Sequence, residues 1–311
     1  MISIVICTYN RAHLLAGALQ SVCEQPLDSS EYELIVVDNN STDNTRAVTE
    51  SFAQRYPNLR YCFEPQQGLS HARNRGFWCA QGEYVGYLDD DAKASAAWLA
   101  VAQEIITRLA PGVFGGPYYA FYNSPQPRWW KDSYRSREHA EKARPLTGYY
   151  EDLSGNNIFF RRTLLEKMGG FDPQFGMSGD KIATCEETEF LLRIRETMPN
   201  ELIYYDPRLT ITHLVHAKKM TFKWLIRHRF ADGRSHGRMY HASKPLSKRK
   251  LLRQSTRLLL SLVKHLVRSV WGREQTQYPY VQNYWFEQAL PRVEKLGSLY
   301  EQWQMVFERK K

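Results

Sequence analysis

The sequence predicts an α/β fold with a mostly parallel central sheet, because short apolar runs alternate with helical patterns over residues 1–110. Few polar residues interrupt the apolar runs, which is typical of strands that are buried on both faces of a parallel sheet. The predicted strands are residues 2–7, 32–37, 59–63 and 83–88. Apolar side chains at helical spacing predict the intervening helices, at residues 11–23, 44–56 and 69–80.

Polar clusters follow three of these predicted strands. Thr8-Tyr9-Asn10-Arg11 follows the first strand, Asp38-Asn39 the second, and Asp89-Asp90-Asp91 the fourth. Ligands of parallel α/β sheets bind beyond the carboxyl ends of the strands, so we expect the three clusters to form one site. Three adjacent carboxylates need a counter-charge, and a hard divalent cation that bridges to a phosphate would supply it. The alternative is a solvated acidic turn.

Residues 111–217 are expected to complete the same domain. Residues 111–150 read as an irregular, aromatic segment whose rings either stack on a sugar or pack a loop onto the sheet. A short strand is predicted at 158–161, with helices at 163–168 and 186–197. We therefore expect a single Rossmann-like domain over residues 1–217, made of a first half at 1–110 and a second half at 111–217.

The last third of the chain carries the whole basic surplus. Residues 1–217 hold 21 Lys+Arg and 27 Asp+Glu, whereas residues 218–311 hold 21 and 6, giving net charges of −6 and +15 that sum to +9. Within this basic helical extension, residues 251–271 predict an amphipathic helix. Its apolar stripe is Leu259, Leu262, Val263, Leu266, Val267 and Val270. Such a helix either lies on an anionic membrane surface or packs in a core with a solvated basic face.

Cysteine usage and the start of the chain favour a reducing compartment. The five cysteines form no C-x-x-C pair, which argues against a disulfide framework or a zinc ribbon. Met1 leads directly into a short apolar run without a basic segment, so no signal peptide is expected. We predict a cytoplasmic protein, peripheral on the inner face of the cell membrane if the basic helix binds lipid.

Six segments in order make the chain resemble an inverting family 2 glycosyltransferase of the GT-A fold, from Ile4 to about Ser235. The segments are Val5-Ile6-Cys7-Thr8-Tyr9-Asn10-Arg11, Val36-Val37-Asp38-Asn39-Asn40-Ser41, Gly68-Leu69-Ser70-His71-Ala72-Arg73-Asn74-Arg75-Gly76, Gly82-Glu83-Tyr84 with the acidic triplet, Gly155-Asn156-Asn157 with Gly170-Phe171-Asp172, and Glu186-Glu187-Thr188-Glu189. Each segment alone is weak, but their order is specific.

This resemblance implies a nucleotide-binding half at 1–110 and an acceptor half at 111–217, and it implies a role for particular residues. The residues expected to bind the donor are Thr8, Tyr9, Asn10, Arg11, Asp38, Asn39, Arg73, Asp89 and Asp90. The sugar or acceptor side falls to Asn156, Asn157 and Glu186. Asp91 is expected to bind Mn²⁺ or Mg²⁺ directly, and His213 to approach the metal or the diphosphate. The metal would neutralise charge on the departing diphosphate.

The catalytic base implied by the resemblance is a carboxylate at the start of a helix, usually an Asp that follows a Glu. Here Glu187 holds that position, with Glu186 and Glu189 as rivals. Acidic residues are favoured in the first turn of any helix by the helix dipole, which is the alternative explanation. A base that works near neutral pH needs its pKa raised by burial or by neighbouring carboxylates.

The sequence thus favours transfer of a sugar from a nucleotide-diphosphate donor, a UDP-sugar above others, to a saccharide or lipid-linked saccharide. A nucleotidyltransferase is a weaker alternative, because the segment after the first strand lacks a glycine-rich phosphate loop. A non-enzymatic protein that binds through its basic region is another, since basicity alone permits nucleic-acid binding. No nucleic acid is expected as partner, because the six segments do not need one.

Overall fold

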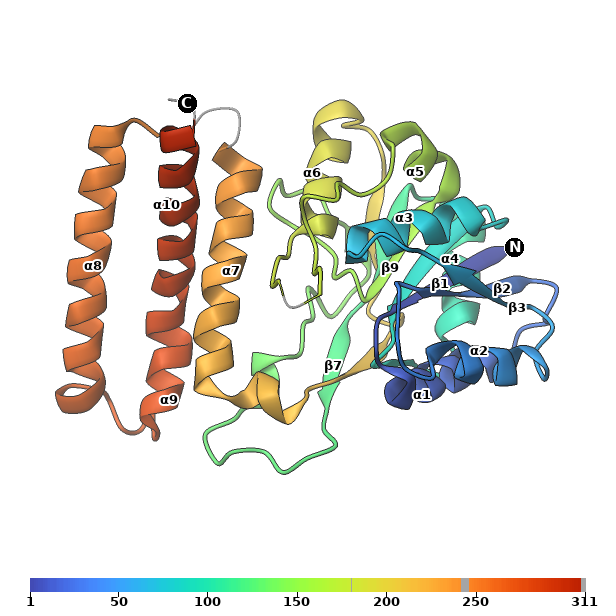
Figure 1. Ribbon diagram of the computed structural model, residues 1–311, viewed down its shortest axis with the longest axis horizontal. Helices are drawn as coiled ribbons and strands as arrows, with labels where there is room; N and C mark the ends of the chain where they lie inside the picture. The colour runs from blue at the N-terminus through green and yellow to red at the C-terminus, as the bar shows by residue number, and fades with distance from the viewer. Residues whose placement is uncertain (180, 242–245, 309–311) are drawn as a thin grey trace. The chain divides into compact units, whose positions relative to one another are not determined.

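The computed structural model describes residues 1–179, 181–241 and 246–308, and it confirms the α/β fold with a helical C-terminal region (Figure 1). The chain divides into two compact units. The N-terminal unit comprises Met1–Phe121, Arg135–Gly179 and Glu186–Leu214. The C-terminal unit comprises Tyr122–Tyr134, Asp180–Cys185 and Val215–Lys311. Every residue predicted for the site belongs to the N-terminal unit.

The first half of the main sheet is parallel, as predicted. Its strands are β1 (Ile2–Thr8), β2 (Tyr32–Asp38), β3 (Leu59–Phe63) and β4 (Tyr84–Asp89), and the helices between them are α1 (Ala12–Cys23), α2 (Thr45–Ala53) and α3 (Leu69–Cys79). The register pairs Thr8 with Asp38 and Cys7 with Asp89. The three predicted polar clusters therefore begin at one edge of one sheet.

Beyond β4 the sheet is mixed. Its order is β3-β2-β1-β4-β9-β6-β10-β8. The added strands are β6 (Val113–Gly115), β8 (Arg144–Pro145), β9 (Asn157–Arg161) and β10 (Ile203–Tyr205). Strand β9 runs antiparallel to both β4 and β6, and its register pairs Asn157 with Leu88. The start of β9 thus lies beside the end of β4, which carries the acidic triplet.

A small second sheet follows the acidic triplet. Its order is β5-β11-β7, with β5 at Ala92–Ala94, β7 at Tyr118–Phe121 and β11 at Ile211–Leu214. In the antiparallel β5–β11 ladder His213 pairs with Ala92, the residue after Asp91. His213 therefore lies within a strand rather than after one, and the ladder brings it to the triplet across more than a hundred residues of sequence.

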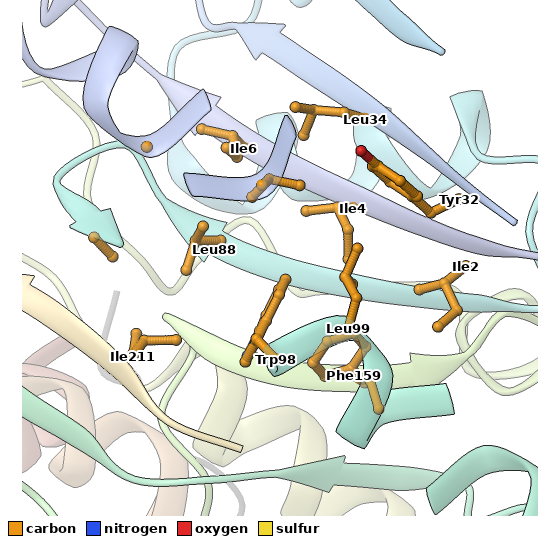
Figure 2. Close-up of a cluster of buried hydrophobic side chains, with 14 of the residues drawn as sticks. Ile2, Ile4, Ile6, Tyr32, Leu34, Leu88, Trp98, Leu99, Phe159 and Ile211 are labelled. Carbon is orange, nitrogen blue, oxygen red and sulfur yellow. The ribbon is translucent and has the colours of Figure 1, made fainter. Parts of the chain in front are cut away.

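The main sheet is buried on both faces. Alternate strand residues enter two different hydrophobic clusters, so that Ile4 and Ile6 lie in one and Val5 in the other. The first cluster includes residues of α1 and of α4 (Trp98–Leu109), and Figure 2 shows Trp98 and Leu99 beside the strand side chains. The second includes residues of α3, α5 (Arg162–Met168) and α6 (Glu186–Thr197). This packing fixes the edge where the polar clusters meet.

The C-terminal unit is largely helical. Its longer helices are α7 (Phe222–His241), α8 (Lys248–Trp271) and α10 (Leu290–Glu308), with the short elements η1 (Asp132–Tyr134), η2 (Ala217–Met220), α9 (Val281–Tyr284) and η3 (Trp285–Ala289). Helices α7 and α10 cross closely at Gly233, where a β-carbon would lie 1.7 Å from the Glu294 carbonyl oxygen. In the part of the chain that the structure describes, every helix is too short or too polar to cross a bilayer.

Candidate active site

The loops after β1 and β2 are tied to each other. The backbone N–H of Asn10 donates to Ser41 Oγ at 2.9 Å, and the backbone N–H of Thr42 donates to Asn10 Oδ1 at 2.7 Å. Asn10 has a φ of 53°, a left-handed conformation that asparagine tolerates better than most residues. Thr8 is buried at the end of β1, whereas the side chain of Tyr9 is exposed. The loop therefore offers Tyr9 and the Asn10 backbone at the sheet edge.

Asp38 is buried at the end of β2 and accepts a hydrogen bond on each carboxylate oxygen. Its donors are the backbone N–H of Ser41 at 2.8 Å and the Tyr61 hydroxyl at 2.8 Å. Burial, together with this hydrogen bond to Asp38, raises the pKa of Tyr61 to about 12. Tyr61 was not predicted for the site, because only the pairing of β3 with β2 brings it to Asp38. Asp38 is thus held rigidly with an oxygen lone pair to spare.

Asn39 is occupied by the protein itself. Its side-chain amide donates to the carbonyls of Glu64 and Gln66, and its Oδ1 accepts from the Gly68 backbone at 2.8 Å. The side chain is buried. Asn39 was predicted to bind the donor. In the structure its amide holds the loop that precedes α3.

The acidic triplet has one cationic neighbour from the first loop. Arg11 Nη1 lies 2.9 Å from Asp90 Oδ1 and 3.3 Å from Asp91 Oδ2. Asp90 is buried, which is the main reason that its pKa rises to about 6, while the Arg11 guanidinium opposes the rise. The Arg11 side chain is 41% exposed, so the protein encloses it only in part. The triplet is therefore not a solvated turn.

Three side chains of this cluster converge on one point. His213 Nε2 lies 3.0 Å from Asp91 Oδ1 and 3.4 Å from Asp89 Oδ2, and one ligand atom from each residue falls within 4.8 Å of the others. Two carboxylates and an imidazole form a donor set that suits Mn²⁺, and the carboxylates alone suit Mg²⁺. Loss of water around Asp89 would raise its pKa, but the His213 imidazole lowers it below the usual range. The residues present fit a divalent metal.

A second carboxylate cluster lies at the start of α6. Arg73 Nη1 donates to Glu186 Oε1 at 2.8 Å, and Nη2 donates to the Gly155 carbonyl at 3.1 Å. The Arg73 guanidinium also lies over the rings of Tyr87 and Phe171. Both charged side chains are at least nine-tenths buried. Arg73 is thus fixed inside the protein by Glu186, which differs from the predicted contact with the donor.

Glycine is required at position 155 by this arrangement. A β-carbon there would lie 2.5 Å from Arg73 Nη2, closer than any real β-carbon contact. The backbone N–H of Gly155 also donates to Glu187 Oε1 at 3.2 Å. Gly155 therefore contacts both the cation and the candidate base, a function that its place in the Gly-Asn-Asn segment did not reveal.

Glu187 has the properties of a base that works near neutral pH. Burial is the largest cause that raises its pKa to about 8, Glu186 adds to the rise, and Arg73 opposes it. Glu189, one rival, is held by Arg193 at 2.9 Å, and Arg193 also donates to the carbonyls of Met168 and Gly170. Glu186, the other rival, is paired with Arg73. Among the three, Glu187 is the carboxylate that forms no ion pair with a described residue.

The two asparagines at the start of β9 differ. Asn156 is buried, and its Oδ1 accepts no hydrogen bond from the residues that the structure describes. Asn157 is fully buried, donates to the carbonyls of Pro117 and Leu209, and accepts from Trp98 Nε1. The Asn157 amide therefore joins β9 to its surroundings, and its predicted place on the sugar or acceptor side stays a prediction.

The model of glycosyl transferase family 2 matches residues 3–169, more than half of the chain. The chain belongs to glycosyl transferase family 2. It is therefore a glycosyltransferase, as the six sequence segments indicated. Family membership therefore argues against the two alternatives, a nucleotidyltransferase and a non-enzymatic binding protein. The matched residues include the acidic triplet and Arg73 but end before Glu187 and His213, so the roles of these two rest on geometry.

Similar proteins support the same assignment. A glucosyl-dolichyl phosphate glucuronosyltransferase of Haloferax volcanii is 26% identical over 246 residues, which cover 75% of this chain and 75% of that protein. The succinoglycan biosynthesis protein ExoM of Rhizobium meliloti is 28% identical over 243 residues, 76% of this chain and 74% of that protein.

Solved structures confirm the GT-A fold. The mannosyltransferase PcManGT from Pyrobaculum calidifontis, in complex with GDP-Man and Mn²⁺, superimposes with a TM-score of 0.56 at 18% identity, covering 96% of this chain and 72% of that one. TarS from S. aureus in complex with UDP gives a TM-score of 0.55 at 16% identity, covering 97% and 91%. At these identities the likeness concerns the fold alone.

Proposed function

We propose that this glycosyltransferase is inverting and metal-dependent, and that it moves a sugar from a nucleotide-diphosphate sugar to a saccharide or a lipid-linked saccharide. The convergence of Asp89, Asp91 and His213 at the sheet edge that carries Asp38 is the observation that supports this most strongly. Residues 1–217 would hold both substrates, and residues 218–311 would form the basic extension.

Asp91 and His213, with Asp89, would hold Mn²⁺ or Mg²⁺. When bound, the metal would neutralise the negative charge that develops on the leaving diphosphate. Asp38 would accept hydrogen bonds from the base or ribose of the donor, since Ser41 and Tyr61 hold its carboxylate in place. Tyr9, Asn10 and Arg11 would line the same pocket, with the Arg11 guanidinium free to turn from Asp90 toward a phosphate.

Glu187 would act as the general base. In its ionised form it would take the proton of an acceptor hydroxyl, whose oxygen then attacks the anomeric carbon. The bond between that carbon and the diphosphate oxygen breaks, and the nucleotide diphosphate leaves with the electron pair. Attack from the side opposite the diphosphate inverts the anomeric centre, so an α-linked donor gives a β-linked product.

A UDP-sugar is the proposed donor and a lipid-linked saccharide the proposed acceptor, at the cytoplasmic face of a membrane. TarS, whose fold is similar, is known in complex with UDP, and one relative is a glucosyl-dolichyl phosphate glucuronosyltransferase. Other neighbours differ, since PcManGT is described with GDP-Man. The identity of the nucleotide in the donor is therefore the first property to measure.

A thermal-shift comparison of UDP, GDP, dTDP and CDP, each with and without Mn²⁺, tests the proposal. A ligand that binds only the folded protein raises the melting temperature by mass action. We expect UDP to give the largest shift, and only when Mn²⁺ is present. A larger shift with GDP would mean that the donor is a GDP-sugar. Equal shifts with and without Mn²⁺ would contradict the proposed metal site.

A further inference from the structure

Helix α8 packs against its own unit through a face that its apolar stripe does not predict. Leu251, Leu258, His265 and Ser269 are its buried residues. Leu251 and Leu258 lie in a cluster with Leu299 of α10, and His265 Nδ1 lies 2.7 Å from the Tyr284 hydroxyl of α9. The buried face of α8 is therefore satisfied within the C-terminal unit, and the predicted stripe is largely left outside it.

A continuous apolar row on α8 faces water. Its members are Leu252, Leu259, Leu260, Val263, Leu266, Val267, Val270 and Trp271, which are between 48% and 81% exposed. Single exposed apolar residues are ordinary on protein surfaces, but a contiguous patch of this kind marks an interaction site. The interpretation of α8 as a core-packing helix is consequently wrong for this row, although it holds for the buried face.

A basic row runs along α8 beside the apolar row. Its members Arg253, Arg257, Lys264 and Arg268 are all exposed, and none of the four forms an ion pair with a residue that the structure describes. At 100° per residue, these four side chains project about 120° from the centre of the exposed apolar row. The sequence holds no acidic residue between Asp232 and Glu274 that could neutralise them.

We propose that the exposed face of α8 binds an anionic lipid bilayer, with the apolar row inserted below the headgroups and the basic row against lipid phosphates. Adjacent apolar and basic rows along one long helix are typical of helices that lie in a membrane interface. Charge complementarity selects this occupant, because residues 218–311 carry a net charge of +15 and an anionic surface attracts each basic side chain near it.

Two other binding partners, a second copy of the chain and nucleic acid, fit the apolar and basic rows less well. A second copy of the chain would cover the apolar row but would bring two units of charge +15 together, which repel each other. Nucleic acid would neutralise the basic row but would leave the apolar row in water. A bilayer of anionic lipid satisfies both rows at once. None of the residues proposed for sugar transfer belongs to α8, so the inference does not depend on the proposed function.

Vesicle sedimentation of the full chain tests the inference without any sugar substrate. Vesicles of phosphatidylcholine alone are compared with vesicles that contain roughly one third phosphatidylglycerol. We expect strong binding only to the anionic vesicles, and weaker binding as salt is raised. Equal binding to both vesicles, or binding to neither, would overturn the inference.

Two α8 variants and one matched control locate the binding surface. Removing two charges in Arg257→Gln with Lys264→Gln should weaken the partition coefficient on anionic vesicles by roughly 30-fold. The control removes two exposed lysines from the N-terminal unit, Lys142→Gln with Lys167→Gln, and should bind as the wild type does. An equal loss in the control would mean that net charge, and not α8, drives binding.

The apolar variant replaces Leu259, Val263 and Leu266 with serine. It should lose binding to anionic vesicles while circular dichroism and the melting temperature stay close to wild type, because all three side chains are exposed. Light scattering of both proteins distinguishes a second copy of the chain as occupant. The inference is overturned if the wild type is a dimer and the serine variant is a monomer that binds anionic vesicles as the wild type does.

Discussion

The N-terminal unit contains two clusters of three carboxylates, and they are neutralised in opposite ways. The triplet Asp89-Asp90-Asp91 faces Arg11, whose side chain is 41% exposed, and His213. The cluster at the start of α6 faces Arg73, whose side chain is 4% exposed and bonded to Glu186 and Gly155. The first cluster has a half-exposed cation as its partner, whereas the second has a buried one.

The two clusters are therefore suited to different partners. A half-exposed cation costs less to displace than a buried one, which fits the proposal that a metal and a diphosphate take its place. A site whose cation is fixed cannot exchange it, but it can hold one further carboxylate, Glu187, with a pKa of about 8. The triplet is thus suited to binding charge and the α6 cluster to moving a proton.

Replacing the candidate base should have the largest effect. Glu187→Gln should lower sugar transfer by up to about 10⁴-fold, because general-base catalysis contributes roughly that much. Nucleotide binding, measured by the UDP-induced melting shift with Mn²⁺, should remain. The matched control is Glu189→Gln, since Glu189 already pairs with Arg193. If the control loses more activity than Glu187→Gln does, the base lies at position 189.

Disrupting the proposed metal site should have the second-largest effect. Asp91→Asn, or EDTA added to the wild type, should lower transfer by about 10³-fold, since a bound metal stabilises the leaving group by several kcal/mol. Unlike Glu187→Gln, this change should also remove the Mn²⁺-dependent part of the UDP melting shift. Full activity of the wild type in EDTA would rule out a catalytic metal.

The two arginines should differ in their effect on stability. Arg73→Met should lower the free energy of unfolding by about 3 kcal/mol or more, because it leaves Glu186 buried without its partner. Arg11→Met should cost about 1 kcal/mol or less, because Arg11 is partly exposed. Urea unfolding measures the free energy of unfolding of both variants. Equal losses of stability would contradict the distinction between a buried and a half-exposed cation.

The pH profile provides a smaller and finer test. Glu187 must be ionised to accept a proton, so kcat/KM should fall about tenfold for each pH unit below a pKa of about 8 and level off above it. Burial and Glu186 raise this pKa, Arg73 lowers it, and Asp152 adds a minor rise. If kcat/KM at saturating metal did not fall as the pH is lowered below about 8, Glu187 would not be the base.

The same shift predicts a stability difference with a definite sign. Because the pKa of Glu187 is raised in the folded state, the folded protein binds the extra proton between the ordinary Glu pKa of 4.5 and about 8. Ionising Glu187 therefore costs stability progressively across that interval. Glu187→Gln should be more stable than the wild type at pH 8, and the difference should shrink toward pH 5, as urea unfolding would measure.

The sequence predicted those parts of the fold that local patterns determine. Buried parallel strands are apolar throughout, so the amino-acid pattern alone located β1 to β4 and the polar clusters at their carboxyl ends. His213 reaches the triplet only through the β5–β11 ladder, and Arg73 reaches Glu186 across the body of the domain. Such long-range pairings leave no periodic signal, so the partners of Arg73 and the buried position of Asn157 were not predictable.

The position of β9 has a consequence for how the enzyme folds. Leu88 and Asn157 are neighbours in the sheet although about 70 residues separate them in sequence, and pairing over such a distance is slow because the intervening chain must first be ordered. The segment that carries Gly155 and Asn156 therefore reaches its place only when β9 pairs with β4. Until it does, Arg73 lacks one of its acceptors and Glu187 lacks its backbone donor. We expect catalytic competence to appear no earlier than the pairing of β9 with β4.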